Sequence, residues 1–91
     1  MNLTITDEQI GQRVAAVRRY RGLSQSDLAR ELGFRSSVSI VHREKGRVPW
    51  EVQEVAKIAR VLDVEVMDLM LISDDLMKEI IRGTLLTGGA A

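Results

Sequence analysis

The sequence predicts an all-α fold of five short helices followed by a C-terminal amphipathic helix. Aromatic residues make up only 3% of the 91 residues, so the core must be built from aliphatic residues, alanine and methionine, which suit packed helices better than a sheet. Apolar residues recur at helical spacing in successive segments. Single glycines, Gly22, Gly33 and Gly46, separate the first of these segments.

The first predicted helix runs from Asp7 to Tyr20. Thr6 can serve as its N-cap, and the acids Asp7 and Glu8 suit its first turn, where the backbone N–H groups carry partial positive charge. Its apolar positions recur at helical spacing, at Ile10, Val14 and Val17.

The second and third helices lie on either side of Gly33. Ser24 and Asp27 form an approximate capping box at the start of the second helix, and Gly33 stops it. Ser36 is expected to cap the third helix, at about 36–44, and the next glycine closes it.

The remaining helices follow Pro49. The fourth is predicted from Glu51 to Leu62, with one broad apolar face made of Val52, Val55, Ala56, Ile58, Ala59 and Leu62. A fifth runs from about Val66 to Leu71. Ser73 then caps a last, amphipathic helix, whose apolar residues include Leu76, Met77, Ile80, Ile81 and Leu85.

Length and composition exclude several classes of protein. A chain of 91 residues holds one domain, since roughly 100 to 200 residues are usual for each. Without cysteine there is no disulfide and no thiolate ligand or nucleophile, and His42 alone cannot form a zinc site, so no metal and no cofactor is expected. The longest apolar run, 69–72, is far shorter than the ~20 residues of a membrane helix. The N-terminus lacks the basic start and apolar core of a secretion signal, so we expect a protein of the reducing cytoplasm.

Charge is unevenly distributed along a chain whose formal net charge is zero. Residues 1–48 carry nine bases and five acids, a formal charge of +4, whereas residues 49–91 carry four bases and eight acids, a formal charge of −4. A basic N-terminal half can bind a polyanion while the acidic half faces a partner. The alternative is a chance scatter of solvated charges.

Three segments together resemble the helix-turn-helix domains of lambda-repressor/Cro-like regulators, the xenobiotic-response-element type. They are 22–33, Ile40 with Glu44-Lys45-Gly46, and 58–64, and the resemblance covers roughly residues 9 to 70. It implies a DNA-binding domain over residues 1–72 and a separate C-terminal element over 73–91. A short second helix held at a steep angle by a tight turn fits the ~12 Å major groove of DNA. Small Ala29 is expected at the crossing of the two helices. The apolar residues expected to pack beneath them are Leu28, Leu32, Ile40, Ile58 and Leu62.

The resemblance places the base-contacting positions on Ser37 and Val38, with His42 further along the helix. None of these is the bidentate Gln or Arg that most often contacts a base, so DNA shape and phosphate contacts are expected to matter more. The segment between Gly33 and Ile40 is one residue longer than is common in the family. This longer turn is expected to bring Arg35 toward the DNA as a further base contact.

Phosphate contacts are expected from both ends of the motif. Gln25 begins the second helix, where the resemblance implies that its amide and the backbone N–H groups grip a phosphate; the alternative is a solvated glutamine beside a serine cap. The other candidates are Ser24, Ser39, Arg43, Lys45 and Arg47. Arg43 stands where the family has an aliphatic or aromatic residue, so we expect it to turn outward or to pair with a local acid such as Glu44.

Two further features have alternative interpretations. Trp50 either covers the core near Val52 and Val55 or donates its indole N–H to a phosphate, and the first is favoured. The cluster 18–21, Arg-Arg-Tyr-Arg, either extends the basic surface or is a solvated helix end.

The sequence therefore predicts a sequence-specific transcriptional regulator, a repressor of the phage repressor or Cro-like kind, that binds double-stranded DNA as a homodimer. Its source would be a bacterium or a phage, and it would associate with the nucleoid when bound. The C-terminal apolar residues would form the dimer or partner interface, or fold back on their own domain. No phosphate-binding loop or catalytic set is present, so no enzyme is expected. Two alternatives are an antitoxin that autoregulates through DNA binding and a protein-interaction module that has lost DNA binding.

Overall fold

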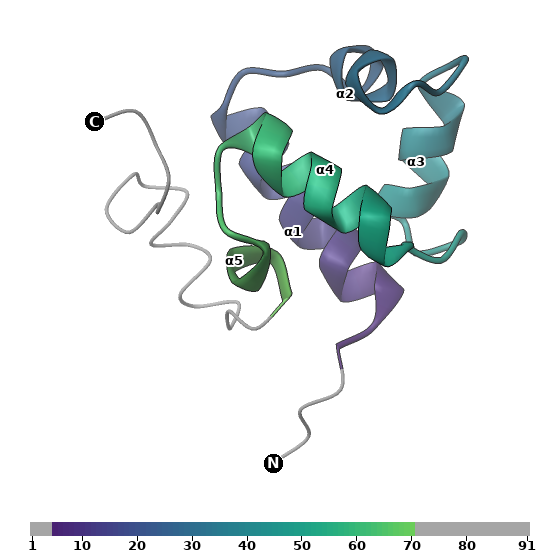
Figure 1. Ribbon diagram of the computed structural model, residues 1–91. Coiled ribbons are helices and arrows are strands. Elements are labelled where there is room, and N and C mark those ends of the chain that lie inside the picture. Colours follow the sequence, from purple (N-terminus) through teal and green to yellow (C-terminus); the bar gives the residue numbers. More distant parts are fainter. Residues whose placement is uncertain (1–4, 71–91) are drawn as a thin grey trace.

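The computed structural model describes residues 5–70, which form five helices around one apolar core (Figure 1). The helices are α1 (Asp7–Tyr20), α2 (Gln25–Leu32), α3 (Val38–Glu44), α4 (Val52–Leu62) and α5 (Val66–Met70). In Figure 1, α4 lies over α1 and runs in a similar direction. The helices α2 and α3 lie together at one end, and α5 packs beside α1 at the other. The prediction of an all-α fold is confirmed.

Local side-chain chemistry sets the ends of the first two helices as predicted. The Thr6 hydroxyl accepts from the Gln9 N–H at 3.1 Å, and the Gln9 amide oxygen accepts from the Thr6 N–H at 3.0 Å. Ser24 and Asp27 form the same reciprocal pair at the start of α2. Gly33, with φ of 78°, ends α2 in the left-handed region that favours glycine.

The predicted start of α3 is wrong. Ser36 does not cap this helix: α3 begins at Val38, and Ser37 occupies the N-cap position without a side-chain hydrogen bond. A capping side chain needs an extended backbone at its own residue, whereas Ser37 already has helical angles, with φ of −67° and ψ of −16°.

The core is aliphatic, as composition predicted. Its fully buried large residues come from all five helices and are Val14, Val17, Leu28, Ile40, Ile58, Leu62 and Leu69. Ala29 is buried at the predicted crossing, and Leu32 is half-buried against the core. Trp50 belongs to this core, and its backbone N–H donates to Asp7 Oδ1 at 2.8 Å. The core interpretation of Trp50 is therefore confirmed, but Val52, which it was expected to cover, is exposed.

The apolar face predicted for α4 is too broad. Val55, Ile58, Ala59 and Leu62 are buried, but Val52 is 85% exposed and Ala56 is exposed. Ala56 lies off the stripe formed by the buried residues, and Val52 lies in the first turn, where no neighbouring helix covers it. Periodicity marks a helix face but not where the neighbouring helices end.

The C-terminal helix predicted after Ser73 lies outside the described residues. So do its interface residues Leu76, Met77, Ile80, Ile81 and Leu85. Within residues 5–70, no helix has the length and apolar character needed to cross a membrane. In the same range, no three histidine or acidic side chains are grouped so that they could hold a metal ion.

Candidate nucleic-acid interface

The backbone of α1 touches the end of α3 directly at Gly11. A Cβ added at Gly11 would lie 2.4 Å from the Glu44 carbonyl oxygen and 2.5 Å from that of Arg43. The following loop also approaches α1 closely, since a Cβ on Gly46 would lie 2.7 Å from the Cα of Glu8. Two glycines thus let α3 sit against α1 without an intervening layer of side chains.

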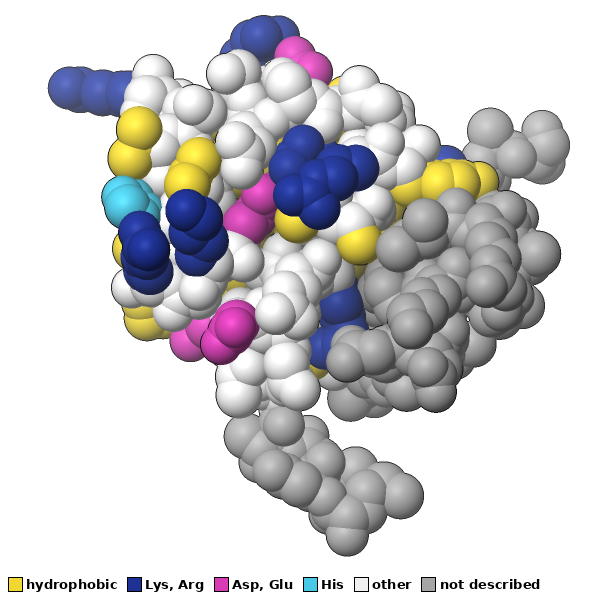
Figure 2. All heavy atoms as spheres, turned by 180° about the vertical axis from the view of Figure 1, so that it is seen from behind, with side chains coloured by type: hydrophobic (Ala, Val, Ile, Leu, Met, Phe, Trp, Pro, Cys, Tyr) yellow, Lys and Arg dark blue, Asp and Glu magenta, His cyan; other side chains and the backbone are white. Residues whose placement is uncertain are grey.

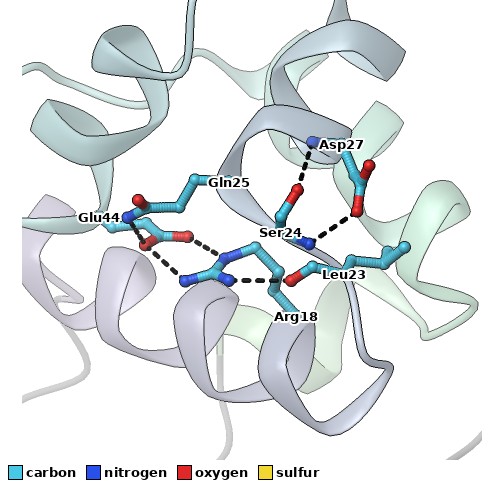
Figure 3. Close-up of polar contacts among 6 residues, drawn as sticks. All are labelled: Arg18, Leu23, Ser24, Gln25, Asp27 and Glu44. Atoms are coloured by element: carbon cyan, nitrogen blue, oxygen red, sulfur yellow. Dashed lines mark hydrogen bonds and ion pairs between the residues drawn. The ribbon is translucent and has the colours of Figure 1, made fainter.

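A buried polar network fixes α2 and α3 relative to α1 (Figure 3). Arg18 donates from Nε to Glu44 Oε2 at 2.7 Å and from Nη2 to Glu44 Oε1 at 3.2 Å. Its Nη1 donates to the carbonyl of Leu23, which leads into α2, at 2.9 Å. Gln25, the first residue of α2, donates from Nε2 to Glu44 Oε1 at 2.9 Å. One carboxylate therefore joins three helices.

The basic cluster at the end of α1 is not one surface. Arg18 is buried in the network just described, and Arg21 donates to the carbonyls of Leu62 and Asp63 at the end of α4. Only Arg19 of the three arginines is exposed. Both sequence-based interpretations of the cluster are therefore wrong for Arg18 and Arg21, because the tertiary fold supplies them with acceptors.

Gln25 and Lys45, predicted separately as phosphate contacts, line one shallow hollow of about 250 Å³. Arg19 lines it too, although the sequence indicates Arg19 only as part of the 18–21 charge cluster. The one carboxylate at the hollow belongs to Glu44, and Arg18 already neutralises it. The hollow therefore presents two cations and a side-chain amide to the solvent, which suits an anion.

The exposed side of α3 carries two of the predicted base-contacting residues. Val38 is 55% exposed and His42 is half-buried, and a spacing of four residues places them on the same face of the helix. Ser37 precedes the helix and is half-buried. Ile40 is fully buried and faces the opposite way, into the core. The helix is thus held from one side and open on the other.

Residues 33–37 join two short helices, α2 and α3, and α3 presents an open face. The sequence profile of the helix-turn-helix domain matches residues 9–69. This chain belongs to the helix-turn-helix family. Comparison with curated proteins and with solved structures gives no significant match. The helix-turn-helix domain is a DNA-binding domain, and both α2 and α3 lie within the matched residues.

Glu44 was the expected partner of Arg43 in the helix-turn-helix domain, but the structure gives Arg43 a different one. Arg43 pairs with Glu54 of α4, through Nη2 to Oε2 at 3.0 Å and Nε to Oε1 at 3.2 Å. Its Nη1 donates to the Ser39 carbonyl at 3.2 Å, and its guanidinium lies 4.5 Å from the centre of the Phe34 ring. Glu44 is unavailable because it is bound to Arg18. The Arg43 side chain is 15% exposed and each of its three nitrogens donates within the protein, so an outward-facing orientation is wrong as well.

The loop after α3 carries the other predicted phosphate contacts of the helix-turn-helix domain. Lys45 and Arg47 are both exposed, and the Arg47 N–H donates to the His42 carbonyl at 2.9 Å, which fixes the loop against the end of α3. Figure 2 shows lysine and arginine side chains gathered beside the histidine at one edge of the molecule. Arg35 is also exposed, but it lies in the turn before α3.

Proposed function

We propose that this chain is a transcriptional regulator of the lambda-repressor/Cro-like type, a repressor that inserts α3 into the major groove of an operator as a homodimer. The observation that carries the proposal is the environment of α3. Its inner side is fixed to α1 and α4, its outer side carries Val38 and His42, and exposed cations flank it in the adjoining segments. Occupying the operator would block access of polymerase to a promoter.

Base contacts are assigned to Ser37, Val38 and His42. Valine can contact a thymine methyl group, histidine can donate to a purine acceptor, and serine can donate or accept. These contacts discriminate modestly between bases. Sequence-dependent DNA shape would then supply a substantial part of the specificity.

Phosphate contacts are assigned to Gln25, Lys45 and Arg47, with the hydroxyls of Ser24 and Ser39. Gln25 and Lys45 share the hollow beside α3, which supports their acting on the same phosphate. The Ser24 oxygen accepts from the Asp27 N–H, and rotation of its hydroxyl would turn the proton from the Asp27 carboxylate to a phosphate. Arg43 is left out because each of its three nitrogens already donates to an acceptor within the protein.

The dimer interface is assigned to the apolar residues of the C-terminal segment, 73–91. A twofold dimer would bind two half-sites about one helical turn, ~34 Å, apart. We further propose that the protein has no catalytic activity, that it acts in the cytoplasm of a bacterium or of a phage-infected cell, and that its concentration or a protein partner regulates it.

Selection of bound duplexes from a random pool, with the purified chain at moderate salt, tests this function. We expect enrichment of an inverted repeat with half-sites near one turn apart. Replacing Val38 or His42 with alanine should change which bases are preferred. Absence of binding even at low salt would overturn the proposal. Co-purification with a second, tightly bound protein that is needed for DNA binding would favour the antitoxin function instead.

A further inference from the structure

The turn between α2 and α3 forms a second hollow, also of about 250 Å³. Its polar lining is made of Ser26 and Arg30 from α2 and Arg35, Ser36 and Ser37 from the turn. Two guanidinium groups and three hydroxyls thus surround one solvent-filled space. No acidic side chain lines it, which makes it a better anion site than the hollow beside Glu44.

Both arginines have donors to spare for an external anion. Arg30 has a side chain that is 73% exposed, and its one ion pair, to Asp27 Oδ1, is long at 3.5 Å. The other Asp27 oxygen is occupied by the Ser24 N–H at 2.8 Å. Arg35 is exposed, and none of the described carboxylates lies within ion-pair distance of it. Exposed pairs of this kind contribute little and give way readily to a stronger acceptor.

The turn is anchored to the rest of the fold on its inner side. The Phe34 N–H donates to the Ala29 carbonyl at 2.9 Å, and the Phe34 ring packs on the guanidinium of Arg43. Arg43 is held in turn by Glu54 of α4. The turn is therefore fixed before any ligand arrives, and less conformational entropy is lost on binding.

We propose that this hollow binds a phosphate of the DNA backbone, with Arg30 and Arg35 as its charged ligands and the hydroxyls of Ser26 and Ser36 as further donors. The inference rests on the proposed insertion of α3 into the major groove. Because α3 has only seven residues, it is about 10 Å long, so both of its ends lie within reach of the phosphates that border the ~12 Å groove. Lys45 and Arg47 hold the backbone at the end of α3, and the hollow holds it at the start. Arg35 thereby contacts the backbone rather than a base.

The test measures DNA affinity as a function of salt for the full chain and its variants, on the duplex that the selection enriches. In the Arg30→Ala/Arg35→Ala variant we expect weaker binding and a slope of log K against log[salt] that is smaller by about one unit. The ranking of duplex sequences should stay the same. The Arg30→Lys/Arg35→Lys variant retains both charges and should restore the slope.

A matched control removes two charges elsewhere. Lys57 and Arg60 are exposed on α4 and line neither hollow, so Lys57→Ala/Arg60→Ala should keep the wild-type slope. An unchanged slope in the Arg30→Ala/Arg35→Ala variant would overturn the inference, as would a changed base preference at one position in Arg35→Ala. Failure of the wild-type chain to bind any duplex would instead overturn the proposed function, and this inference with it. Thermal unfolding of each variant checks that it is folded.

Discussion

The guanidinium of Arg18 in α1 and the carboxylate of Glu44 at the end of α3 form a two-point ion pair whose side chains are only 7% and 6% exposed. The same carboxylate accepts from Gln25 at the start of α2. Burial removes water from both charges, so each depends on the other for its solvation. The pair therefore fixes the relative placement of the two motif helices, and its loss should affect stability and DNA binding together.

Glu44→Leu should lower the free energy of unfolding by roughly 3 to 5 kcal/mol, because it leaves the Arg18 charge buried without a counter-charge. The double variant Arg18→Met/Glu44→Leu should lose less free energy of unfolding than Glu44→Leu alone, because no charge then remains buried. Urea denaturation of the single and double variants measures both values. A double variant less stable than Glu44→Leu would contradict this account.

Gly11→Ala should destabilise the fold although alanine is the better helix former. The added methyl group would meet the backbone carbonyls of Arg43 and Glu44, which cannot move without shifting α3. The overpacking cost exceeds the ~1 kcal/mol gain in helix propensity, and we expect a net loss of about 1 to 2 kcal/mol. Gln12→Ala, at the next and exposed position, is the control and should change stability by less than about 0.5 kcal/mol in thermal or urea unfolding. Equal stability of the two variants would argue against the close approach of α1 and α3.

The pKa of Asp27 should lie below the ordinary aspartate value of 3.8. The largest cause is the hydrogen bond from the Ser24 backbone N–H, and smaller contributions come from the Ser24 hydroxyl and the charge of Arg30. A lowered pKa means that the carboxylate stabilises the folded state at neutral pH. That contribution declines as the pH falls below 3.8 and is lost once the pH passes below the lowered pKa. Carbon NMR of the side-chain carboxyl measures the midpoint. Ser24→Ala should raise the midpoint only in part, since the backbone donor remains; a wild-type midpoint at or above 3.8 would refute the assignment.

Arg43→Met should weaken the fold without removing a phosphate contact. It breaks the paired hydrogen bonds to Glu54 and the contact with Phe34, and we expect a loss of about 2 kcal/mol in the free energy of unfolding. The salt dependence of DNA binding should keep its slope. Lys45→Ala should behave in the opposite way, with unchanged stability and a slope smaller by about one unit. A smaller slope in Arg43→Met would show that this arginine contacts DNA.

Much of the fold was predictable because it depends on neighbours in sequence. The capping pairs at Thr6 and Ser24 and the helix stop at Gly33 use residues no more than a few positions apart, so their chemistry is visible in the chain itself. The start of α3 was not predictable in this way. The backbone angles of Ser37 depend on how the longer turn is anchored through Phe34 and Arg43.

The partners of the charged residues required the tertiary structure. Arg18, Arg21 and Arg43 look like surface cations in the sequence, yet each has at least one acceptor on another helix or at its end, up to 42 positions away for Arg21. Spacing along one helix cannot indicate which carboxylate or carbonyl a guanidinium will meet across a helix crossing. The candidate interface therefore stays a prediction, while the division between structural and exposed arginines was wrong for Arg18, Arg21 and Arg43.

The sequence by itself determined the helical class, the helix ends that caps and glycines mark, the aliphatic core and the helix-turn-helix motif. These features follow from short-range hydrogen bonding and from the period of apolar residues, both of which are local. Only the tertiary structure decided that Glu44 is buried in an ion pair with Arg18 and that Arg43 supports the turn between α2 and α3. It also decided that Arg30 and Arg35 line the same hollow. The reason is physical: burial and ion pairing depend on which helices come into contact, and that is a property of the packed chain as a whole.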